Sequence, residues 1–600
     1  LGQAGIYSVE VKSAGGSTGV LPVHLGAVGA ITAPDIVNES GLMTLKLAAA
    51  GPGLKFQWLH NGQPIDDDAL LGISGATRPT LTINKVGMDH AGDYSCRVRM
   101  PDAAGGAEME RLSAVKTVAV RLRPVVNATM LGPWKVSGSV SDAFTAQNGP
   151  LQFKVTGLPK GVTLNKFTGQ LSGKPLAPKI YRLGVSASNQ AGSGPVRFFD
   201  VVCNDLDARA KGSFVGLVER APGNGDLGGA ISFSVSASGV ITGKLSMGPE
   251  TRSFRATWES LPGPVLTSAF EVRRSAGQVP WLITLNVSAA DGKVDGTLTE
   301  GGQTPLEIEA WQSDWNARSL PALNHAGTYT AALLPESALA VLQLQMPPPI
   351  PMADPPMPEG AGYAMLKVTT AGAVSWSGRL ADGTTLTRSL RLGREGDFPL
   401  HALLYKNTGS IQGWVKIQPD LPNLAASEAN GFLGWSKRDQ GDSKSGNYRA
   451  GFPLHALTVL GGTYRASDSV PVQLALSSPP SKARLAFAGG GIDSAAQAAD
   501  TGITLGISAD NKIQEPAVQD NPTRTRITSL AVKTGLFRGS LTLRDPAPGG
   551  GAGNLDRSVA FYGMLVPRLK LGVGSFLLNQ AVLDRPVPVK SGLVVLEAAP

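Results

Sequence analysis

Apolar and polar residues alternate along much of the second half of the chain. In residues 230–247, AISFSVSASGVITGKLSM, the apolar Ile231, Phe233 and Val235 alternate with serines before a turn at Gly239. An alternation of period two predicts strands with one buried face, and a glycine between two such runs predicts a hairpin. The second half of the chain is therefore expected to form antiparallel β-hairpins.

Pairs of glycines four residues apart recur in these hairpins. They occur in SGVITGKLSM at 238–247, DGKVDGTLTE at 291–300, NTGSIQGWVKI at 407–417 and TGLFRGSLTL at 534–543, and AGAVSWSGRL at 371–380 is a looser relative with two extra residues. The first glycine of a pair predicts a turn with positive φ, and the second predicts a bulge or a close approach between strands. We interpret the motif as a repeated construction unit and not as a binding site.

Two further short sequence motifs repeat at a larger spacing. Gly-x-aromatic openers occur at 212–214, 327–329 and 462–464, and FPLHAL occurs at 398–403 and 452–457. Because one hairpin cannot bury its apolar face alone, such repeats predict stacked or closed hairpins, and the pattern leaves barrel, sandwich and propeller open. The predicted β-repeat units are 211–325, 326–461 and 462–600, and the second contains a proline-rich insertion, 346–360, which is expected to be a stiff surface segment.

The first third of the chain carries the residues of a different architecture. Trp58 is followed by a D-x-x-G-x-Y-x-C pattern whose last members are Tyr94 and Cys96. This arrangement resembles the immunoglobulin (Ig) fold over residues 29–122, which implies a buried tryptophan and a tyrosine corner two residues before a strand cysteine. A leucine stands where the partner cysteine of that fold is expected, so we expect Cys96 to be a buried free thiol.

Two neighbouring segments carry related patterns. Gly5 and Tyr7 repeat the same corner, so residues 1–28 resemble the last strands of a truncated Ig-like domain, which implies that the chain is the C-terminal part of a longer protein. Residues 126–205 contain GLPKGVTLNKFTGQLSG followed by Tyr181, and they resemble the putative-Ig, cadherin-like modules of bacterial surface proteins. The first third is therefore expected to contain β-sandwiches in series.

Composition narrows the class of protein further. The chain of 600 residues exceeds what one hydrophobic core supports, and 74 glycines with 43 prolines are typical of short strands joined by tight turns. The net charge of +8, from 54 Lys and Arg against 46 Asp and Glu, is a mild excess that excludes the concentrated basic face of a nucleic-acid binder. Two distant cysteines exclude a disulfide framework, and no apolar run is long enough for a transmembrane helix.

Few motifs point to chemistry. Asn204, Asp205 and Asp207 lie between the putative-Ig segment and the first β-repeat unit, where cadherin-like modules hold calcium with oxygen ligands, and a plain polar linker is the alternative. The G-x-S-x-G match at 15–19 and the G-x-G-x-x-G match at 223–228 lack the strand-to-helix context that would make them functional. We interpret both glycine matches as chance.

Aromatic and histidine residues of the second repeat unit offer two further hypotheses. Trp376, Trp414 and Trp435 would stack on sugar rings if they were exposed, and burial in a core is the alternative. His401 and His455 occupy the same position in the repeated phrase FPLHAL. We expect a shared structural role for them, such as a ring nitrogen bonded to a backbone carbonyl.

The patterns together predict an all-β chain, in which Ig-like β-sandwiches in series precede a C-terminal antiparallel β-hairpin repeat region. The repeat region is similar to the C-terminal regions of very large Ig-containing secreted proteins of environmental bacteria, which implies an extracellular or cell-surface location. The expected function is structural or adhesive rather than enzymatic, with partners among copies of itself, neighbouring surface proteins or polysaccharide, and one version is assembly into a filament or sheath. A secreted carbohydrate-binding protein is the alternative, and an extracellular enzyme with an unrecognised site is the third hypothesis. Calcium is the one cofactor considered, and no nucleic acid is expected as a partner.

Overall fold

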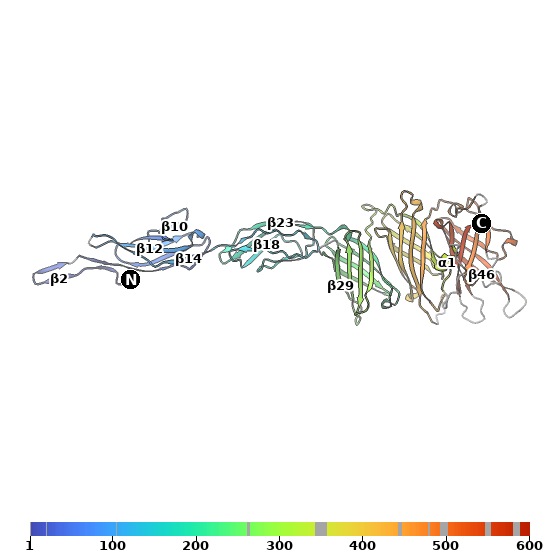
Figure 1. The fold of residues 1–600 in the computed structure, drawn as a ribbon, viewed down its shortest axis with the longest axis horizontal. Coiled ribbons are helices and arrows are strands. Elements are labelled where there is room, and N and C mark those ends of the chain that lie inside the picture. The colour runs from blue at the N-terminus through green and yellow to red at the C-terminus, as the bar shows by residue number, and fades with distance from the viewer. Residues whose placement is uncertain are drawn as a thin grey trace. The chain divides into compact units, whose positions relative to one another are not determined.

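The computed structural model describes residues 2–19, 21–103, 105–260, 265–342, 357–441, 447–477, 481–492, 502–546, 554–579 and 589–599. The chain divides into two compact units, Leu1–Asp205 and Leu206–Pro600 (Figure 1). Both units consist mainly of antiparallel strands, so the predicted all-β class is confirmed. None of the described helices is long and apolar enough to cross a membrane.

Helical segments in the described residues are short. The α-helices are α1 (Glu336–Leu342) and α2 (Val470–Gln473), and the 3-10 turns are η1 (Met88–His90), η2 (Ala208–Ala210), η3 (Pro222–Asn224), η4 (Tyr405–Asn407), η5 (Leu424–Ala426), η8 (Val518–Asp520) and η10 (Pro567–Leu569). They connect strands and form no helical layer.

The first unit begins with a long hairpin. Strand β1 (Gly5–Tyr7) pairs with β4 (Val23–Leu25), and β2 (Glu10–Ser13) pairs with β3 (Gly16–Gly19). The hydroxyl of Tyr7 donates a hydrogen bond to the carbonyl oxygen of Gln3, four residues back, at 2.7 Å. This is the tyrosine-corner contact that the sequence predicts.

An Ig-like sandwich of two sheets follows. One sheet has the order β10-β11-β7-β5 and the other β6-β14-β12-β8-β9, with β13 paired to β12. The strands are β5 (Ala27–Thr32), β6 (Ile36–Asn38), β7 (Met43–Ala50), β8 (Lys55–His60), β9 (Gln63–Pro64), β10 (Ile73–Ser74), β11 (Thr80–Ile83), β12 (Gly92–Met100), β13 (Met109–Leu112) and β14 (Lys116–Arg121).

The core of this sandwich contains the predicted residues. Trp58 and Cys96 are register partners on β8 and β12, and they are fully buried together with Tyr94. The hydroxyl of Tyr94 donates to the carbonyl oxygen of His90 at 2.8 Å. Leu45 packs in the same core, and Cys96 is a free thiol, which confirms the expectation of an Ig-like core without its disulfide.

The third module of the first unit is a second small sandwich. Its strands are β15 (Val125–Val126), β16 (Trp134–Lys135), β17 (Ala146–Gln147), β18 (Gln152–Thr156), β19 (Val162–Leu164), β20 (Leu171–Gly173), β21 (Lys179–Asn189), β22 (Gly192–Ser193) and β23 (Arg197–Asn204). The main sheet has the order β16-β23-β21-β18, with β22 paired to β21, and two-stranded sheets β15-β17 and β19-β20 accompany it. Here too a tyrosine hydroxyl, that of Tyr181, donates to a carbonyl oxygen four residues back, that of Ala177, at 2.9 Å.

Three large sheets make up the second unit, and they share one strand order. The first contains β24 (Gly212–Val218), β25 (Gly229–Val235), β26 (Val240–Met247), β27 (Glu250–Thr257), β28 (Glu259–Ser260), β29 (Val265–Val272), β30 (Trp281–Ser288), β31 (Lys293–Glu300) and β32 (Leu306–Gln312). The second contains β33 (Gly327–Pro335), β34 (Gly362–Val368), β35 (Ala373–Arg379), β36 (Thr385–Arg391), β37 (Asp397–Leu404), β38 (Gly409–Gln418), β39 (Glu428–Lys437) and β40 (Phe452–Thr463). The third contains β41 (Ser481–Gly489), β42 (Ile503–Ile507), β43 (Ile513–Gln514), β44 (Arg526–Ala531), β45 (Leu536–Pro546), β46 (Asn554–Val566), β47 (Leu571–Asn579) and β48 (Val589–Ala598).

Each of these sheets curls into a ring of up-and-down strands, which we call the first, second and third ring. Consecutive strands are neighbours, and the first strand of each ring pairs with its last: β24 with β32, β33 with β40, and β41 with β48. Each ring has a seam, which is the place where the two end strands of the sheet order meet, and it lies midway along the ring's sequence. In the first ring β27 continues past Trp258 into β28, which pairs with β29 and closes the seam; in the other two the seam lies between β36 and β37 and between β43 and β44.

Two boundaries differ from those expected. The predicted start of the third unit, the opener 462–464, is wrong for its first two residues, because Gly462 and Thr463 are the end of β40 and pair with the first strand of the second ring. Tyr464 does pack into the core of the third ring, whose first strand begins only at Ser481. In the proline-rich insertion, residues 346–356 lie outside the described residues, whereas Pro358 and Gly360 are buried, so the surface interpretation is wrong for the end of the insertion.

The glycine motif behaves as predicted at most sites. Gly239 has φ +76°, and a Cβ added to Gly243 would lie 2.5 Å from the Cβ of Phe233 on the paired strand. Gly409 is the exception, because the residues with positive φ in its turn are 405–407. This glycine is needed for a different reason: an added Cβ would lie 2.3 Å from a backbone oxygen of β39. The motif is therefore a hairpin turn joined to a close strand contact.

We expect Gly539→Ala to destabilise the protein by about 2–3 kcal/mol, because overpacking forces neighbouring atoms apart. The added methyl group would lie 2.1 Å from the carbonyl oxygen of Arg526 and 2.2 Å from the ring of Phe561. Gly502→Ala in the same ring is the control, since its nearest atom would be 3.5 Å away. Urea unfolding measures both variants, and equal midpoints would contradict the close contact at Gly539.

Both cysteines are expected to resist alkylation in the folded protein. Burial raises the pKa of the Cys96 thiol to about 11, and it also raises the pKa of Cys203. Because the thiolate is the reactive form, iodoacetamide at pH 8 should leave the native chain unmodified and label both thiols in guanidinium. Mass spectrometry provides the count, and rapid labelling of the native chain would contradict the burial of the labelled site.

Candidate functional site

The tryptophans proposed for sugar stacking are largely inside the second ring. Trp376 and Trp435 are 0% exposed, and Trp414 is half-buried. The stacking hypothesis is wrong for Trp376 and Trp435, because a ring enclosed by its own core presents no face to a ligand. The indole N–H of Trp435 donates to the hydroxyl of Tyr405 at 3.0 Å, and that hydroxyl donates to the buried carboxylate of Asp382 at 2.6 Å.

The residues proposed for calcium lie at the end of β23 and directly after it. Asn204 is the last residue of β23 and is exposed, as is Asp205. Within the described residues, no group of three or more His, Cys, Asp or Glu side chains is placed to hold a metal ion. Calcium binding by Asn204, Asp205 and Asp207 stays a prediction.

The two histidines of the repeated phrase behave as expected. A ring nitrogen of His401 lies 3.3 Å from the carbonyl oxygen of Leu227, and a ring nitrogen of His455 lies 3.2 Å from that of Pro358. The shared role of bonding a backbone carbonyl is confirmed. Leu227 belongs to the β24–β25 loop of the first ring, so the His401 contact joins two rings.

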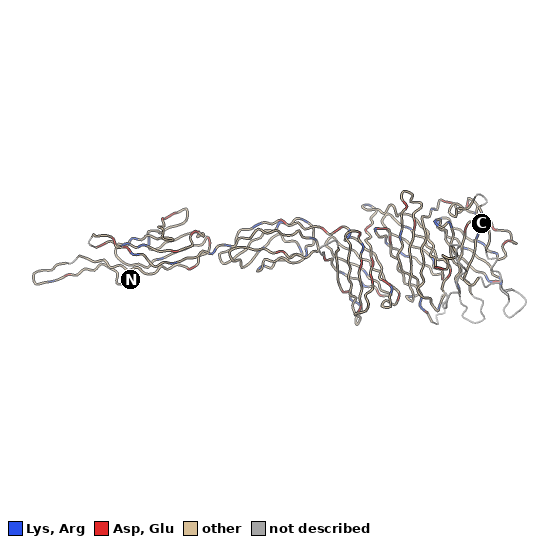
Figure 2. The backbone as a smooth tube through the Cα atoms, in the orientation of Figure 1, with Lys and Arg blue, Asp and Glu red and all other residues tan. Residues whose placement is uncertain are grey.

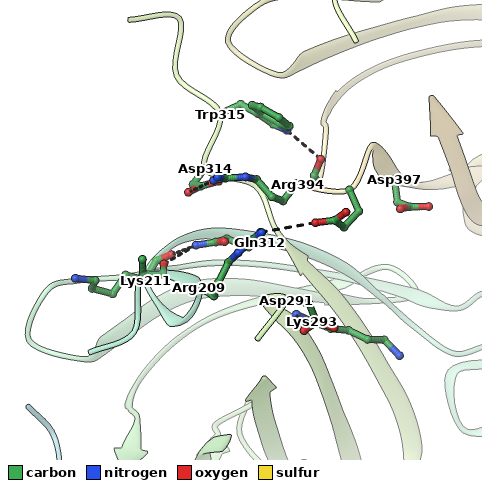
Figure 3. Close-up of polar contacts among 12 residues, drawn as sticks. Arg209, Lys211, Asp291, Lys293, Gln312, Asp314, Trp315, Arg394 and Asp397 are labelled. Carbon is green, nitrogen blue, oxygen red and sulfur yellow. Dashed lines mark hydrogen bonds and ion pairs between the residues drawn. The ribbon is translucent and has the colours of Figure 1, made fainter. Parts of the chain in front are cut away.

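The best-defined polar cluster lies where the chain leaves the first ring and enters the second (Figure 3). The side-chain amide of Gln312, at the end of β32, donates to the carbonyl oxygens of Ala208 and Lys211, each at 2.8 Å. The backbone carbonyl oxygen of Gln312 accepts a bond of 2.7 Å from the backbone N–H of Arg394, in the loop between β36 and β37. The side chain of Gln312 is 1% exposed, so these bonds form away from water.

The next residues of the same segment continue the contact. Arg394 donates to both carboxylate oxygens of Asp314 at 2.8 Å, and the indole N–H of Trp315 donates to the carbonyl oxygen of Gly393 at 2.9 Å. The hydroxyl of Ser313 donates to the carbonyl oxygen of Leu392 at 2.7 Å. The segment leaving the first ring is thus bonded, residue by residue, to the loop that spans the seam of the second ring.

A second cluster joins the same two rings through the β24–β25 loop. The guanidinium of Arg220 donates to the carbonyl oxygens of Ser410 and Gly434 on β38 and β39, at 3.1 and 2.7 Å. Burial lowers the pKa of Arg220 to about 10, so it stays charged at neutral pH. The side-chain amide of Gln412 donates to the carbonyl oxygen of Val218 at 2.8 Å and accepts from the N–H of Gly229 at 3.0 Å.

The second and third rings are joined by a mainly apolar contact. Buried residues of both rings, including two in the β33–β34 connection, form one cluster: Ala332, Leu334, Ala338, Ala361, Val566, Val573, Leu593 and Val595. Two hydrogen bonds also join these rings: the N–H of Ser591 donates to the hydroxyl of Tyr448 at 2.6 Å, and the N–H of Gly490 donates to the carboxylate of Glu359 at 2.7 Å. The rings of the second unit are therefore in continuous contact.

A hollow of 550 Å³ lies at one end of the first ring, between the β24–β25 and β31–β32 loops. Glu219 and Glu300 line it. The carboxylate of Glu300 is bonded by Arg274 and by the indole N–H of Trp281, and that of Glu219 accepts from the backbone N–H of Glu307. Both carboxylates are therefore bonded to groups of the first ring.

Charged residues are dispersed over the chain. Figure 2 shows Lys and Arg interspersed with Asp and Glu in both units. This pattern agrees with the mild net charge of +8.

Comparison with known proteins identifies one domain. Residues 113–203 match the family model described as the putative Ig domain, which covers the third module of the first unit. No curated protein matches the chain. The strand pairing and this match together define a protein with tandem Ig-like domains.

Solved structures with several Ig domains also align with the chain. A titin fragment, I67–I69, is 17% identical and covers 34% of this chain and 75% of its own, with a TM-score of 0.21. The insect immune protein hemolin is 13% identical over 33% of this chain and 55% of its own, with a TM-score of 0.20, and domains 3–5 of Drosophila OTK are 12% identical over 47% and 95%, with a TM-score of 0.17. At these scores the alignments add no argument to the strand pairing.

We expect acid to weaken the contact at His401. Burial lowers the pKa of His401 to about 4, against about 6.5 for an unfolded histidine, so the unfolded state binds more protons between these values. Stability therefore falls as the pH falls through this window, by about 2–3 kcal/mol between pH 7 and pH 4.5.

The variant His401→Gln removes this part of the pH dependence while keeping an N–H donor for the carbonyl oxygen of Leu227. Free energies of unfolding at pH 7 and 4.5, for wild type and variant, measure the effect. His24→Gln, in the other unit, is the control. If the His401→Gln and wild-type values changed in parallel, the assignment to His401 would be wrong.

Proposed function

We propose that this chain is a structural or adhesive protein of the cell exterior, in which the Ig-like sandwiches act as a spacer and the three rings act as one C-terminal module. Ig-like sandwiches are common in cell-surface proteins, where they present or separate binding surfaces. The role requires no catalysis. It also requires no metal, so it is independent of the calcium hypothesis.

The observation that carries the proposal is the coupling of the rings by buried, direction-specific polar groups. Arg220 and Gln412 bond backbone groups across two rings, and the backbone carbonyl oxygen of Gln312 accepts a bond from the N–H of Arg394 at their junction. Breaking a buried charged contact leaves an unsatisfied charge and is strongly destabilising. Neighbouring rings held in this way resist separation and rotation, which is what a module under load needs.

Assembly into a filament or sheath is the more specific version of this proposal. Sheet-edge strands such as β5 of the Ig-like sandwich pair with another strand on one side, and an edge can accept a strand from another chain. Self-association or binding to neighbouring surface proteins through such edges would build a continuous layer. Electron microscopy of the purified chain tests this version separately.

Protease treatment of intact producing cells tests the location. Peptides from both units, released before lysis and identified by mass spectrometry, are the expected result. Release only from lysed cells would overturn the extracellular role. A cytoplasmic marker protein, which should appear only after lysis, is the control.

Ring coupling predicts the behaviour of Arg220→Met. The loss of this guanidinium should cost about 3 kcal/mol, because the acceptors on β38 and β39 lose a charged donor. We expect the unfolding transition of the second unit to split or to move to lower temperature in calorimetry, and the force that separates the rings to fall in single-molecule pulling. Arg391→Met, at an exposed site on β36, is the control.

The result that would contradict the coupling is a variant Arg220→Met with the wild-type transition and pulling force. The rings would then be joined by their apolar contacts alone. The location of the protein would not be affected by that result.

A further inference from the structure

A second hollow lies on the outer face of the third ring. Its volume is 390 Å³, and it is bounded by the segment that follows β43 and by strands β44 to β46. Arg524, Arg526, Ser540, Thr542 and Ser558 line it. A volume of this order lies within the range of small-ligand sites.

The backbone projects both arginines outward. Thr523 and Thr525 are 0% exposed and their hydroxyls bond each other at 2.7 Å, whereas the alternate residues Arg524 and Arg526 are exposed. Asn521 bonds both the N–H and the carbonyl oxygen of Thr525, at 2.7 and 2.8 Å. The segment that carries the arginines is therefore held by buried polar contacts and does not depend on a ligand for its shape.

Arg524 is also in a strained conformation. Its φ is +47°, in the left-handed region that a side chain with a Cβ rarely adopts. Strain of this kind persists only where surrounding contacts impose it, and it is concentrated at functional sites. The contacts of Asn521 and the two threonines are those that impose it here.

The two guanidiniums form no ion pair with another described residue, although each carries five N–H donors. Arg526 stands opposite Ser540 in the β44–β45 register, and Thr542 stands opposite Ser558 in the β45–β46 register. The hydroxyls of Ser540, Thr542 and Ser558, which can donate and accept hydrogen bonds, therefore lie beside the two arginines. Glu515 is the one acidic residue of the lining, so the lining has an excess of positive charge.

We propose that this hollow binds an acidic polysaccharide, with the arginines on a carboxylate or sulfate group and the serine and threonine hydroxyls on sugar hydroxyls. Guanidinium groups match the planar, two-oxygen geometry of these anions. The lining contains no aromatic side chain, so neither stacking on a neutral sugar nor stacking on a nucleic-acid base is favoured.

This inference names a partner for the extracellular role proposed above and rests on that role for its biological setting. It places carbohydrate binding at a polar site on the third ring, since Trp376 and Trp435 of the second ring are buried. Binding at an outer face would let a long polymer pass along the ring without threading through it.

The purified full chain should be tested by biolayer interferometry against alginate, dextran sulfate and neutral dextran. We expect binding to alginate or to dextran sulfate, weakening as NaCl is raised, and no binding to dextran. The double variant Arg524→Gln/Arg526→Gln should lose about tenfold or more in affinity, because two charge-assisted contacts are removed. Binding to alginate would indicate a carboxylate ligand, and binding to dextran sulfate would indicate a sulfate ligand.

The matched control is Arg255→Gln/Arg273→Gln, which removes the same charge from exposed positions of the first ring. It should bind as the wild type does. An equal loss in both double variants would show non-specific attraction and overturn the site, as would binding to dextran or the absence of binding to both acidic polymers. Protease treatment of cells would still decide the extracellular role, so failure of the site and failure of the role are distinguishable.

Discussion

The pairing of the first strand of each ring with its last strand is the contact on which the second unit depends. It brings together residues far apart in sequence, such as Phe214 with Gln312 and Leu485 with Leu596. A curled row of hairpins without this pairing would expose the face that now buries Trp376 and Phe398. The entropy cost of closing such a long loop grows only slowly with its length, whereas the apolar area buried grows with every strand.

The joints between rings differ in kind, and the difference has a physical meaning. The first and second rings meet through directed hydrogen bonds of the Arg220 and Gln412 side chains and of the backbone carbonyl oxygen of Gln312, which are satisfied in one relative orientation. The second and third rings meet mainly through apolar side chains, which stabilise contact with less directional preference. One joint therefore determines orientation, and the other contributes mostly burial.

Local patterns predicted local structure well. The alternation in β25 is reproduced by the burial of Ile231, Phe233 and Val235. The tyrosine corners could be predicted because the tyrosine and the turn that it bonds lie within a few residues of each other. The histidines of FPLHAL were correctly expected to bond backbone carbonyls. Their partners were not predictable, since Leu227 and Pro358 are 174 and 97 residues away in the chain.

The sequence by itself determined the all-β class, the positions of most hairpins and the Ig-like core around Trp58, because period-two alternation, positive-φ glycines and corner tyrosines act over a few residues. Only the tertiary structure decided which strands close the rings and that Trp376 and Trp435 face inward. It also placed Arg524 and Arg526 beside the hydroxyls of two other strands. Each of these outcomes depends on the register and curvature of strands that are distant in sequence, and no local pattern encodes curvature.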